Sequence, residues 1–168
     1  KGNMKKQITF LMFVILMLSL LTVCAFATSY SVQASTEAQI SDSIKNADNG
    51  DTVNVSLTAD IEMLSTVRIS KAITVNLSFN SYQINYTGST SNEVGKPAFY
   101  IENDKAIFNI YGSNKLNSAD QYTHYSDAVR PDMKGTGCLI TVTNGTVNIK
   151  DAYLLGASNA FIINSPYV

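Results

Sequence analysis

Side chains suited to ligand contact are concentrated in one long segment, residues 117–137, which shows little apolar periodicity. Tyrosine rings in this segment could stack on sugar rings, while its acidic and basic groups could hydrogen-bond to sugar hydroxyls. Long insertions on a rigid framework often carry function. If the chain contacts a ligand, we therefore expect this segment to make the contact. The alternative is a solvated loop with a further strand through Asp127–Arg130. The candidate ligand-binding residues are Tyr122, His124, Tyr125, Asp127, Arg130, Asp132 and Lys134.

The sequence does not identify catalytic residues, which remain unknown at this stage. His124 is the only histidine, and no nucleophile–base pair is evident around it. Glycoside hydrolysis needs two carboxyl groups about 5–10 Å apart. The pairs Asp60/Glu62 and Glu102/Asp104 would each share one face of an extended chain. The simpler interpretation is that these acids are exposed at turns and strand ends.

The metal-binding residue types form no recognisable cluster in the sequence. The acidic residues are scattered and do not recur at a regular interval, so no calcium-binding column is predicted. Cys24 lies in an apolar leader, which leaves Cys138 without a disulfide partner. We therefore predict no metal site and no cofactor, and we expect Cys138 to be a small buried residue.

The N-terminal residues have the pattern of a secretory signal peptide. Lys5 and Lys6 precede an uncharged, strongly apolar run over residues 8–27. The run ends in Ala25-Phe26-Ala27, which fits the small-x-small cleavage pattern. The sequence therefore predicts a signal peptide at 1–27, a mature N-terminus at Thr28, and a linker over residues 28–35.

Two alternatives to cleavage remain open. The apolar run is long enough to cross a bilayer of ~30 Å, so residues 8–27 could be an uncleaved membrane anchor. Leu21–Cys24 also resembles a lipobox, in which Cys24 would be lipidated. All three interpretations keep the basic end inside and place the rest of the chain outside the cytoplasm, in a secreted or cell-surface protein.

The charge balance limits the classes of partner. Lys1, Lys5 and Lys6 belong to the leader, whereas none of the 13 acidic residues does. The remaining chain has the length of one domain and is mildly acidic. Nucleic-acid binding needs a basic surface, so a nucleic acid is not an expected partner.

One short helix is predicted between Thr36 and Ala47. Thr36 is a suitable N-cap, and Gln39 follows at the capping-box position. Ile40, Ile44 and Ala47 form a narrow apolar stripe. Asn49-Gly50 is expected to end the helix, with Gly50 in a left-handed conformation.

After Gly50 the pattern changes to short strands that alternate apolar and polar residues. No second helical period is present. The predicted strands are Val53–Leu57, Thr66–Ile69, Ile73–Phe79, Gln83–Tyr86, Phe99–Glu102, Ile107–Tyr111, Leu139–Thr143, Thr146–Lys150 and Ala160–Ile163.

A repeated triplet indicates how these strands are arranged. Val53-Asn54-Val55 recurs as Val75-Asn76-Leu77, Phe108-Asn109-Ile110 and Val147-Asn148-Ile149. The first interval matches the ~20–25 residues of one β-helix coil, and the two longer intervals fit one coil plus an insertion, or up to two coils. Stacking would place the apolar residues of each triplet in two inward columns, with asparagine outward. We therefore predict an all-β fold, a right-handed parallel β-helix with a short N-terminal capping helix. A β-sandwich or jelly roll is the alternative.

The region from the predicted helix to Val53 resembles the opening of pectate-lyase-like β-helix proteins. The resemblance is carried by Ala38-Gln39-Ile40, by Ile44–Ala47 and by Asn49-Gly50-Asp51-Thr52-Val53. Gly145–Asp151 is similar to a coil motif of secreted adhesin-like relatives. The resemblance covers residues 36–168 and implies a capping helix followed by β-helix coils. Lyases of this superfamily use an Arg or Lys base and calcium, so calcium is expected only if the protein is a lyase.

We expect a secreted or cell-surface β-helix protein that acts in adhesion or glycan binding, with a polysaccharide or cell-surface glycan as partner. The alternative is a polysaccharide lyase or glycoside hydrolase with its catalytic coils beyond this chain. No cap is apparent after the apolar run Phe161–Ile163. We therefore expect an N-terminal fragment of a longer β-helix, which would self-associate through this edge.

Overall fold

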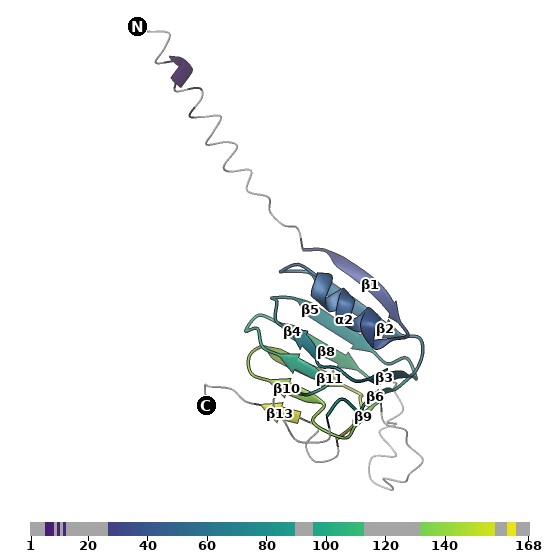
Figure 1. Cartoon of the computed structure of the whole chain (residues 1–168). Coiled ribbons are helices and arrows are strands. Elements are labelled where there is room, and N and C mark those ends of the chain that lie inside the picture. Colours follow the sequence, from purple (N-terminus) through teal and green to yellow (C-terminus); the bar gives the residue numbers. More distant parts are fainter. Residues whose placement is uncertain are drawn as a thin grey trace.

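The computed structural model describes residues 6–8, 10, 12, 27–89, 96–112, 132–156 and 161–163 (Figure 1). Most of the predicted leader lies outside the described residues, so its three interpretations remain predictions. Within the described part of the chain, no helix is long and apolar enough to cross a membrane.

From residue 27 onward, the described part of the chain is mostly β, with helix α2 packed on strands. The helix α2 spans Glu37–Asn46. The strands are β1 (Ser29–Ala34), β2 (Thr52–Leu57), β3 (Ile61–Met63), β4 (Val67–Ile69), β5 (Thr74–Ser78), β6 (Ile84–Tyr86), β7 (Phe99–Ile101), β8 (Ile107–Tyr111), β9 (Met133–Gly135), β10 (Ile140–Val142), β11 (Thr146–Lys150), β12 (Leu154–Gly156) and β13 (Phe161–Ile163).

The strands form three sheets in which every described pairing is parallel. The five-stranded sheet has the order β1-β2-β5-β8-β11, and the two four-stranded sheets have the orders β13-β10-β7-β4 and β12-β9-β6-β3. From β2 onward the chain visits the three sheets in a constant rotation. Each circuit therefore adds one strand to each sheet, and the strands stack in successive layers (Figure 1).

Helix α2 forms where the sequence predicted it. Thr36 and Gln39 make the predicted capping box, and Ile40 and Ile44 are buried against the strands. The last helical residue is Asn46, one residue earlier than predicted, and Ala47 is an extended C-cap. Gly50 does adopt positive φ, but it does so in the turn that follows the helix. Figure 1 shows α2 lying beside β1 and β2 at one end of the stack.

The prediction of a linker over residues 28–35 is wrong for most of that range. Ser29–Ala34 forms β1, which pairs in parallel with β2 in register from Ser29↔Thr52 to Ala34↔Leu57. The segment is short and polar at alternate positions, so it resembles a spacer when β2 is not considered. Its Tyr30 packs partly buried on the core, and Ala34 is fully buried.

The triplets align as the repeat predicted. Val53, Val75, Phe108 and Val147 are in register, and so are Val55, Leu77, Ile110 and Ile149. The triplet asparagines are separated by 22, 33 and 39 residues along the chain. Because β5 pairs directly with β8 and β8 with β11, each longer interval is one circuit with an insertion. The insertions fall between β6 and β7 and between β8 and β9.

The outward asparagines of these triplets form a hydrogen-bonded ladder. Asn76 Nδ2 donates to Asn54 Oδ1 at 2.7 Å, Asn109 Nδ2 to Asn76 Oδ1 at 2.7 Å, and Asn148 Nδ2 to Asn109 Oδ1 at 2.8 Å. Asn54 Nδ2 in turn donates to Ser29 Oγ at 3.2 Å. The ladder links all five strands and stiffens the outer face of the sheet.

The core lies between the three sheets. Phe99 and Phe108 approach with ring centroids 4.9 Å apart, and both are fully buried. Cys138 is a free, buried cysteine, as predicted. Strands β3, β9 and β12, each of three residues, were not predicted.

Candidate functional site

A polar groove lies at the carboxyl ends of β5, β8 and β11. Its cavity volume is about 400 Å³, within the ~300–1,000 Å³ range of small-molecule sites. One aromatic ring and several hydrogen-bonding side chains line it. The lining residues, here called the Tyr111 groove, are Ser78, Asn80, Ser81, Tyr111, Gly112, Lys150 and Asp151.

Three of these residues form a row across the sheet. Ser78 pairs with Tyr111, and Tyr111 pairs with Lys150. Their neighbours Leu77 and Ile110 point into the core, so the row points outward because side chains alternate along a strand. Adjacent members are about 4.8 Å apart along the sheet. Tyr111 is 41% exposed, so a large part of its ring is open to a ligand.

The turns that border the groove have unusual backbone conformations. Asn80, Ser81 and Asp151 have φ values of 48°, 79° and 52°, and they are the non-glycine residues with positive φ in the described part of the chain. Asn and Asp tolerate this region, whereas Ser81 is a less common occupant. Such conformations cluster at ligand sites, where surrounding structure holds them in place.

Side-chain hydrogen bonds and close packing hold these turns. Ser78 Oγ donates to Asn80 Oδ1 at 2.9 Å, and Asn80 Nδ2 donates to Leu57 O at 3.4 Å. Gly112 lies against the backbone of Asp151 so closely that a Cβ atom would clash with it. The groove is thus built on a rigid base rather than on loosely packed loops.

The electrostatics of the groove are balanced. Lys150 supplies one positive charge and Asp151 one negative charge, and both are exposed. The remaining lining groups are hydroxyls, an amide and backbone. This combination suits a ligand with many hydroxyl groups and little net charge.

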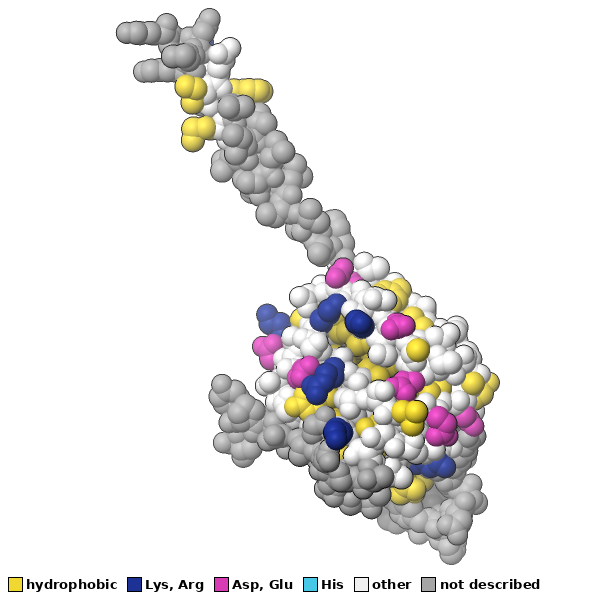
Figure 2. Space-filling model, viewed as in Figure 1, with side chains coloured by type: hydrophobic (Ala, Val, Ile, Leu, Met, Phe, Trp, Pro, Cys, Tyr) yellow, Lys and Arg dark blue, Asp and Glu magenta, His cyan; other side chains and the backbone are white. Residues whose placement is uncertain are grey.

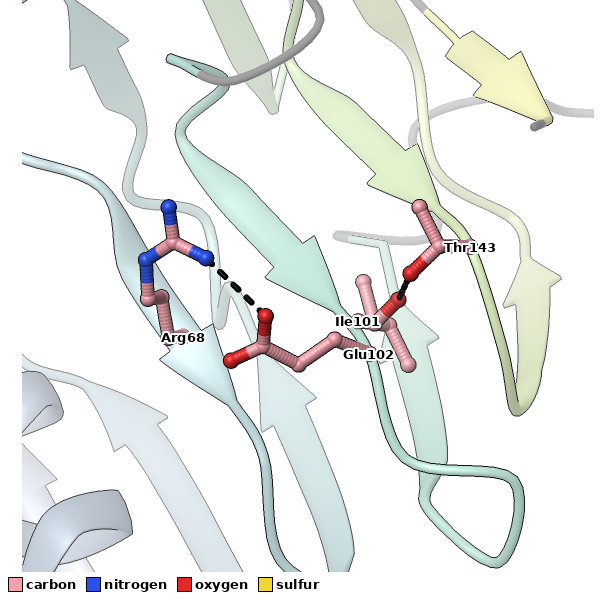
Figure 3. A network of polar contacts seen from close by, with 4 residues as sticks. All are labelled: Arg68, Ile101, Glu102 and Thr143. Atoms are coloured by element: carbon pink, nitrogen blue, oxygen red, sulfur yellow. Dashed lines mark hydrogen bonds and ion pairs between the residues drawn. The ribbon is translucent and has the colours of Figure 1, made fainter.

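A second groove of about 260 Å³ lies between α2 and β4 and includes Lys45, Arg68 and Lys71. Two of its three cations already have partners. Arg68 Nη1 lies 3.0 Å from Glu102 Oε2, and Figure 3 shows its guanidinium directed at that carboxylate. Lys71 Nζ donates to the carbonyl oxygens of Lys45 and Ala47 at the end of α2.

Arg68 also lies 4.6 Å from the centroid of the Tyr100 ring, which packs against it. Figure 2 shows basic and acidic side chains interspersed on the viewed face, without a large patch of one sign. This second groove is therefore a weaker candidate than the Tyr111 groove, because its charged groups are mainly engaged within the protein.

The predicted ligand-binding residues are only partly placed. Tyr122, His124, Tyr125, Asp127 and Arg130 lie outside the described residues. Asp132 is 4% exposed, and its Oδ2 accepts a hydrogen bond from Tyr153 N at 2.9 Å. This hydrogen bond positions the backbone just before β12. Lys134 is exposed on β9, where it pairs with Asn85 of β6 on one side and Leu155 of β12 on the other. Of these two predicted residues, Lys134 is therefore exposed and Asp132 is buried.

The acids considered for hydrolysis are mostly engaged in the framework. Asp60 Oδ1 accepts from Gln83 N at 3.0 Å, and Glu62 Oε2 accepts from Asn85 Nδ2 at 2.6 Å. Glu102 pairs with Arg68. Among the residues that the structure describes, no group of three His, Cys, Asp or Glu side chains could hold a metal ion.

The Tyr111 groove was missed at the sequence level, although a signal for it exists. Ser78, Tyr111 and Lys150 each stand two residues after a triplet asparagine, so an extended alignment of the repeats would have placed them in one row.

Searches with protein-family models, among curated proteins and among solved structures found no match.

Proposed function

We propose that this chain is an exported right-handed parallel β-helix that binds a neutral glycan in the Tyr111 groove. The fold part rests on the constant rotation of the chain among three parallel sheets. A sandwich is built mainly from antiparallel strands, whereas all described pairs here are parallel. Parallel crossover connections are right-handed in about 98% of cases, which supports the handedness.

The proposal includes kinship with pectate-lyase-like proteins. Its support is the order of elements after the leader: a capped helix at one end of the stack, a glycine at positive φ, and Asp51-Thr52 leading into β2. Export is supported by the basic start, the apolar run and the Ala25-Phe26-Ala27 pattern. A secreted or cell-surface location follows from that leader.

The observation that carries the binding proposal is the exposed Tyr111 ring in a rigid, polar groove. An aromatic face packs on the apolar face of a sugar ring, while neighbouring hydroxyl, amide and charged groups hydrogen-bond to its hydroxyls. Ser78 and Lys150 flank the ring in register. Asn80 and Asp151 approach from the bordering turns.

The groove also includes the last described residues before the predicted ligand-binding segment in the sequence, Tyr111 and Gly112. Residues 113–131 follow directly after Tyr111 and Gly112 in the chain and carry Tyr122, His124 and Tyr125. Binding by both the groove and this segment would extend the site beyond one sugar ring. The two contributions are separable, because one lies on a strand and the other in an insertion.

Glycan-array screening of the secreted protein, followed by calorimetry with the best neutral glycan, tests the proposal. Tyr111→Ala is expected to weaken binding at least about tenfold, which corresponds to ~1.4 kcal/mol. Ile107→Ala is the matched control, because Ile107 is an exposed apolar residue on the same strand and face. It is expected to leave the affinity unchanged.

Replacement of residues 117–131 by a short Gly-Ser bridge separates the two contributions. Loss of binding with Tyr111 intact would move the site to the insertion. Binding of acidic glycans only, or equal effects of Tyr111→Ala and Ile107→Ala, would contradict the proposal for the groove.

A further inference from the structure

The backbone nitrogen at the predicted cleavage point faces a buried carboxylate. Thr28 N lies 2.8 Å from Asp51 Oδ1, and Asp51 is 8% exposed. Asp51 Oδ2 accepts a second hydrogen bond, from Asp48 N at 2.8 Å. The carboxylate is therefore held in one orientation, with one oxygen directed at the first residue of the predicted mature chain.

The rest of Thr28 is already part of the folded domain. Its carbonyl oxygen accepts a hydrogen bond from Thr52 N at 2.8 Å, which continues the β1–β2 pairing to this residue. Ala27 lies over the turn before β2, where a Cβ atom on Gly50 would be 3.6 Å from Ala27 Cβ. The position of the Thr28 nitrogen thus follows from the pairing of this end of β1 with β2.

We propose that cleavage after Ala27 turns the Thr28 nitrogen into an ammonium group that forms an ion pair with Asp51. A signal peptidase hydrolyses the Ala27–Thr28 peptide bond with one water molecule. The water oxygen joins the Ala27 carbonyl carbon, and the leader departs with a carboxylate. The Thr28 nitrogen gains two protons and becomes –NH₃⁺. This inference rests on the proposed export and adds a role for the new terminus.

The ion pair would strengthen the docking of β1. In the uncleaved chain Asp51 accepts a neutral N–H, whereas a charged donor makes a shorter and stronger hydrogen bond to a carboxylate. β1 forms one edge of the five-stranded sheet and lies beside α2. Cleavage would therefore stabilise the end of the stack that α2 caps, because Asp51 would bind the mature N-terminus.

The surroundings of Asp51 define a pH dependence. The hydrogen bonds from Thr28 and Asp48 hold the pKa of Asp51 below its ordinary value. Lys71 acts on Asp51 in the same direction, and burial, with Asp51 and Asp48, raises the pKa of Tyr30. A carboxylate with a lowered pKa stabilises the fold above its unfolded value of ~3.9, and this contribution is lost as pH falls through the folded pKa.

The ammonium group gives the stability the opposite pH dependence. Its ordinary pKa is ~7.7–8.0, and pairing with Asp51 raises it in the folded state. The stabilisation would be fully present below about pH 8 and would be lost as pH rises through the higher folded value. Tyr30 and Lys71 are present in every variant compared, so neither residue can account for a difference between the variants.

The experiment uses the full chain with its leader, expressed in a secreting host. Intact-mass and N-terminal analysis identify the first residue, and the acetylation rate of the terminal amine at pH 8 measures its protection. In one variant a glycine is inserted after Ala27, which moves the ammonium one residue from Asp51 while leaving the Thr28 amide in place. Asp51→Asn removes the carboxylate charge, and Asp104→Asn is the control, because Asp104 is an exposed turn residue.

The terminal amine is expected to react severalfold more slowly in the processed protein and in Asp104→Asn than in Asp51→Asn and the glycine-insertion variant. The thermal midpoint of the processed protein should also fall more between pH 8 and pH 10 than that of Asp51→Asn. A different first residue would overturn both the cleavage prediction and this inference. A chain that begins at Thr28 but reacts as fast as the glycine-insertion variant would overturn the ion pair alone and leave export standing.

Discussion

The two ends of the five-stranded sheet differ in how well their inward side chains are covered. Near β1, Val53 and Val55 are almost completely buried, with α2 beside them. On β11, Ile149 occupies the same column as Val55 but is 44% exposed. Both are β-branched apolar residues at equivalent strand positions. Among the described strands, β2 has a neighbour on both sides and β11 on one side only, so burial does not follow from the strand position alone.

The largest effect is expected when the same substitution is made at a buried and at an exposed isoleucine. Ile110 and Ile149 are register partners on adjacent strands, and only Ile110 is fully buried. Ile110→Ala is expected to lower the free energy of unfolding by about 2–5 kcal/mol, because it leaves a cavity. Ile149→Ala should change it by only about 0.5 kcal/mol. Chemical denaturation measures both, and equal losses would show that the far end is covered in solution.

The asparagine ladder offers a second pair of substitutions. Asn109 donates one ladder hydrogen bond and accepts another, whereas Asn148 contributes as the donor at the far end. With about 0.5–1.5 kcal/mol for each hydrogen bond, Asn109→Ala is expected to cost about 1–3 kcal/mol and Asn148→Ala about half of that. Urea unfolding of both variants provides the measurement. A larger effect at Asn148 would contradict the expectation that the cost follows the number of ladder hydrogen bonds.

The helix cap is expected to have a smaller effect, confined to the covered end. Gln39 N donates to Thr36 Oγ1 at 3.3 Å, so Thr36→Ala removes the N-cap and should cost about 1 kcal/mol. Thr36→Ser keeps the hydroxyl and serves as the control. Amide hydrogen exchange should become faster in α2 and β1 while β8 and β11 are unaffected. Uniform acceleration along the stack would mean that the two ends unfold together.

The smallest effect is expected on the outer surface between the ends. The Arg68 and Glu102 side chains are 51% and 31% exposed, so solvent screens their ion pair. A double-mutant cycle with Arg68→Gln and Glu102→Gln should give a coupling energy of about 0.5 kcal/mol or less. It should vanish at about 1 M salt, where the screening length is ~3 Å. A coupling above about 2 kcal/mol would show that surface pairs matter as much as core packing.

The sequence predicted the strands that carry the repeated triplet well, but it missed several of the shorter strands between them. β8 and β11 have the predicted bounds, and the other predicted strands differ by one residue at one or both ends. The sequences of β8 and β11 alternate over five residues, which is long enough to define a face. β3 and β12 have three residues each, and β1 looks like a polar spacer until it is paired with β2.

The candidate site could not be predicted from local pattern. Ser78, Tyr111 and Lys150 each follow a triplet asparagine by two residues, but the intervals between the triplets are unequal, so the row appears only when the repeats are aligned. The predicted site drew instead on composition within 117–137, most of which lies outside the described residues. Lys134 and Asp132 appeared together in that segment, although one is exposed on a strand and the other is buried.

The sequence by itself determined the capped helix, the class of strand and the register of the triplets. These features depend on interactions between near neighbours in the chain and on an apolar alternation that only one register can bury. Only the tertiary structure decided which circuits stack directly, how far each inward residue is covered, and which polar groups meet at Tyr111 and Asp51. Those outcomes depend on contacts across 22 to 39 residues, where insertion length and packing, rather than local propensity, decide which groups meet.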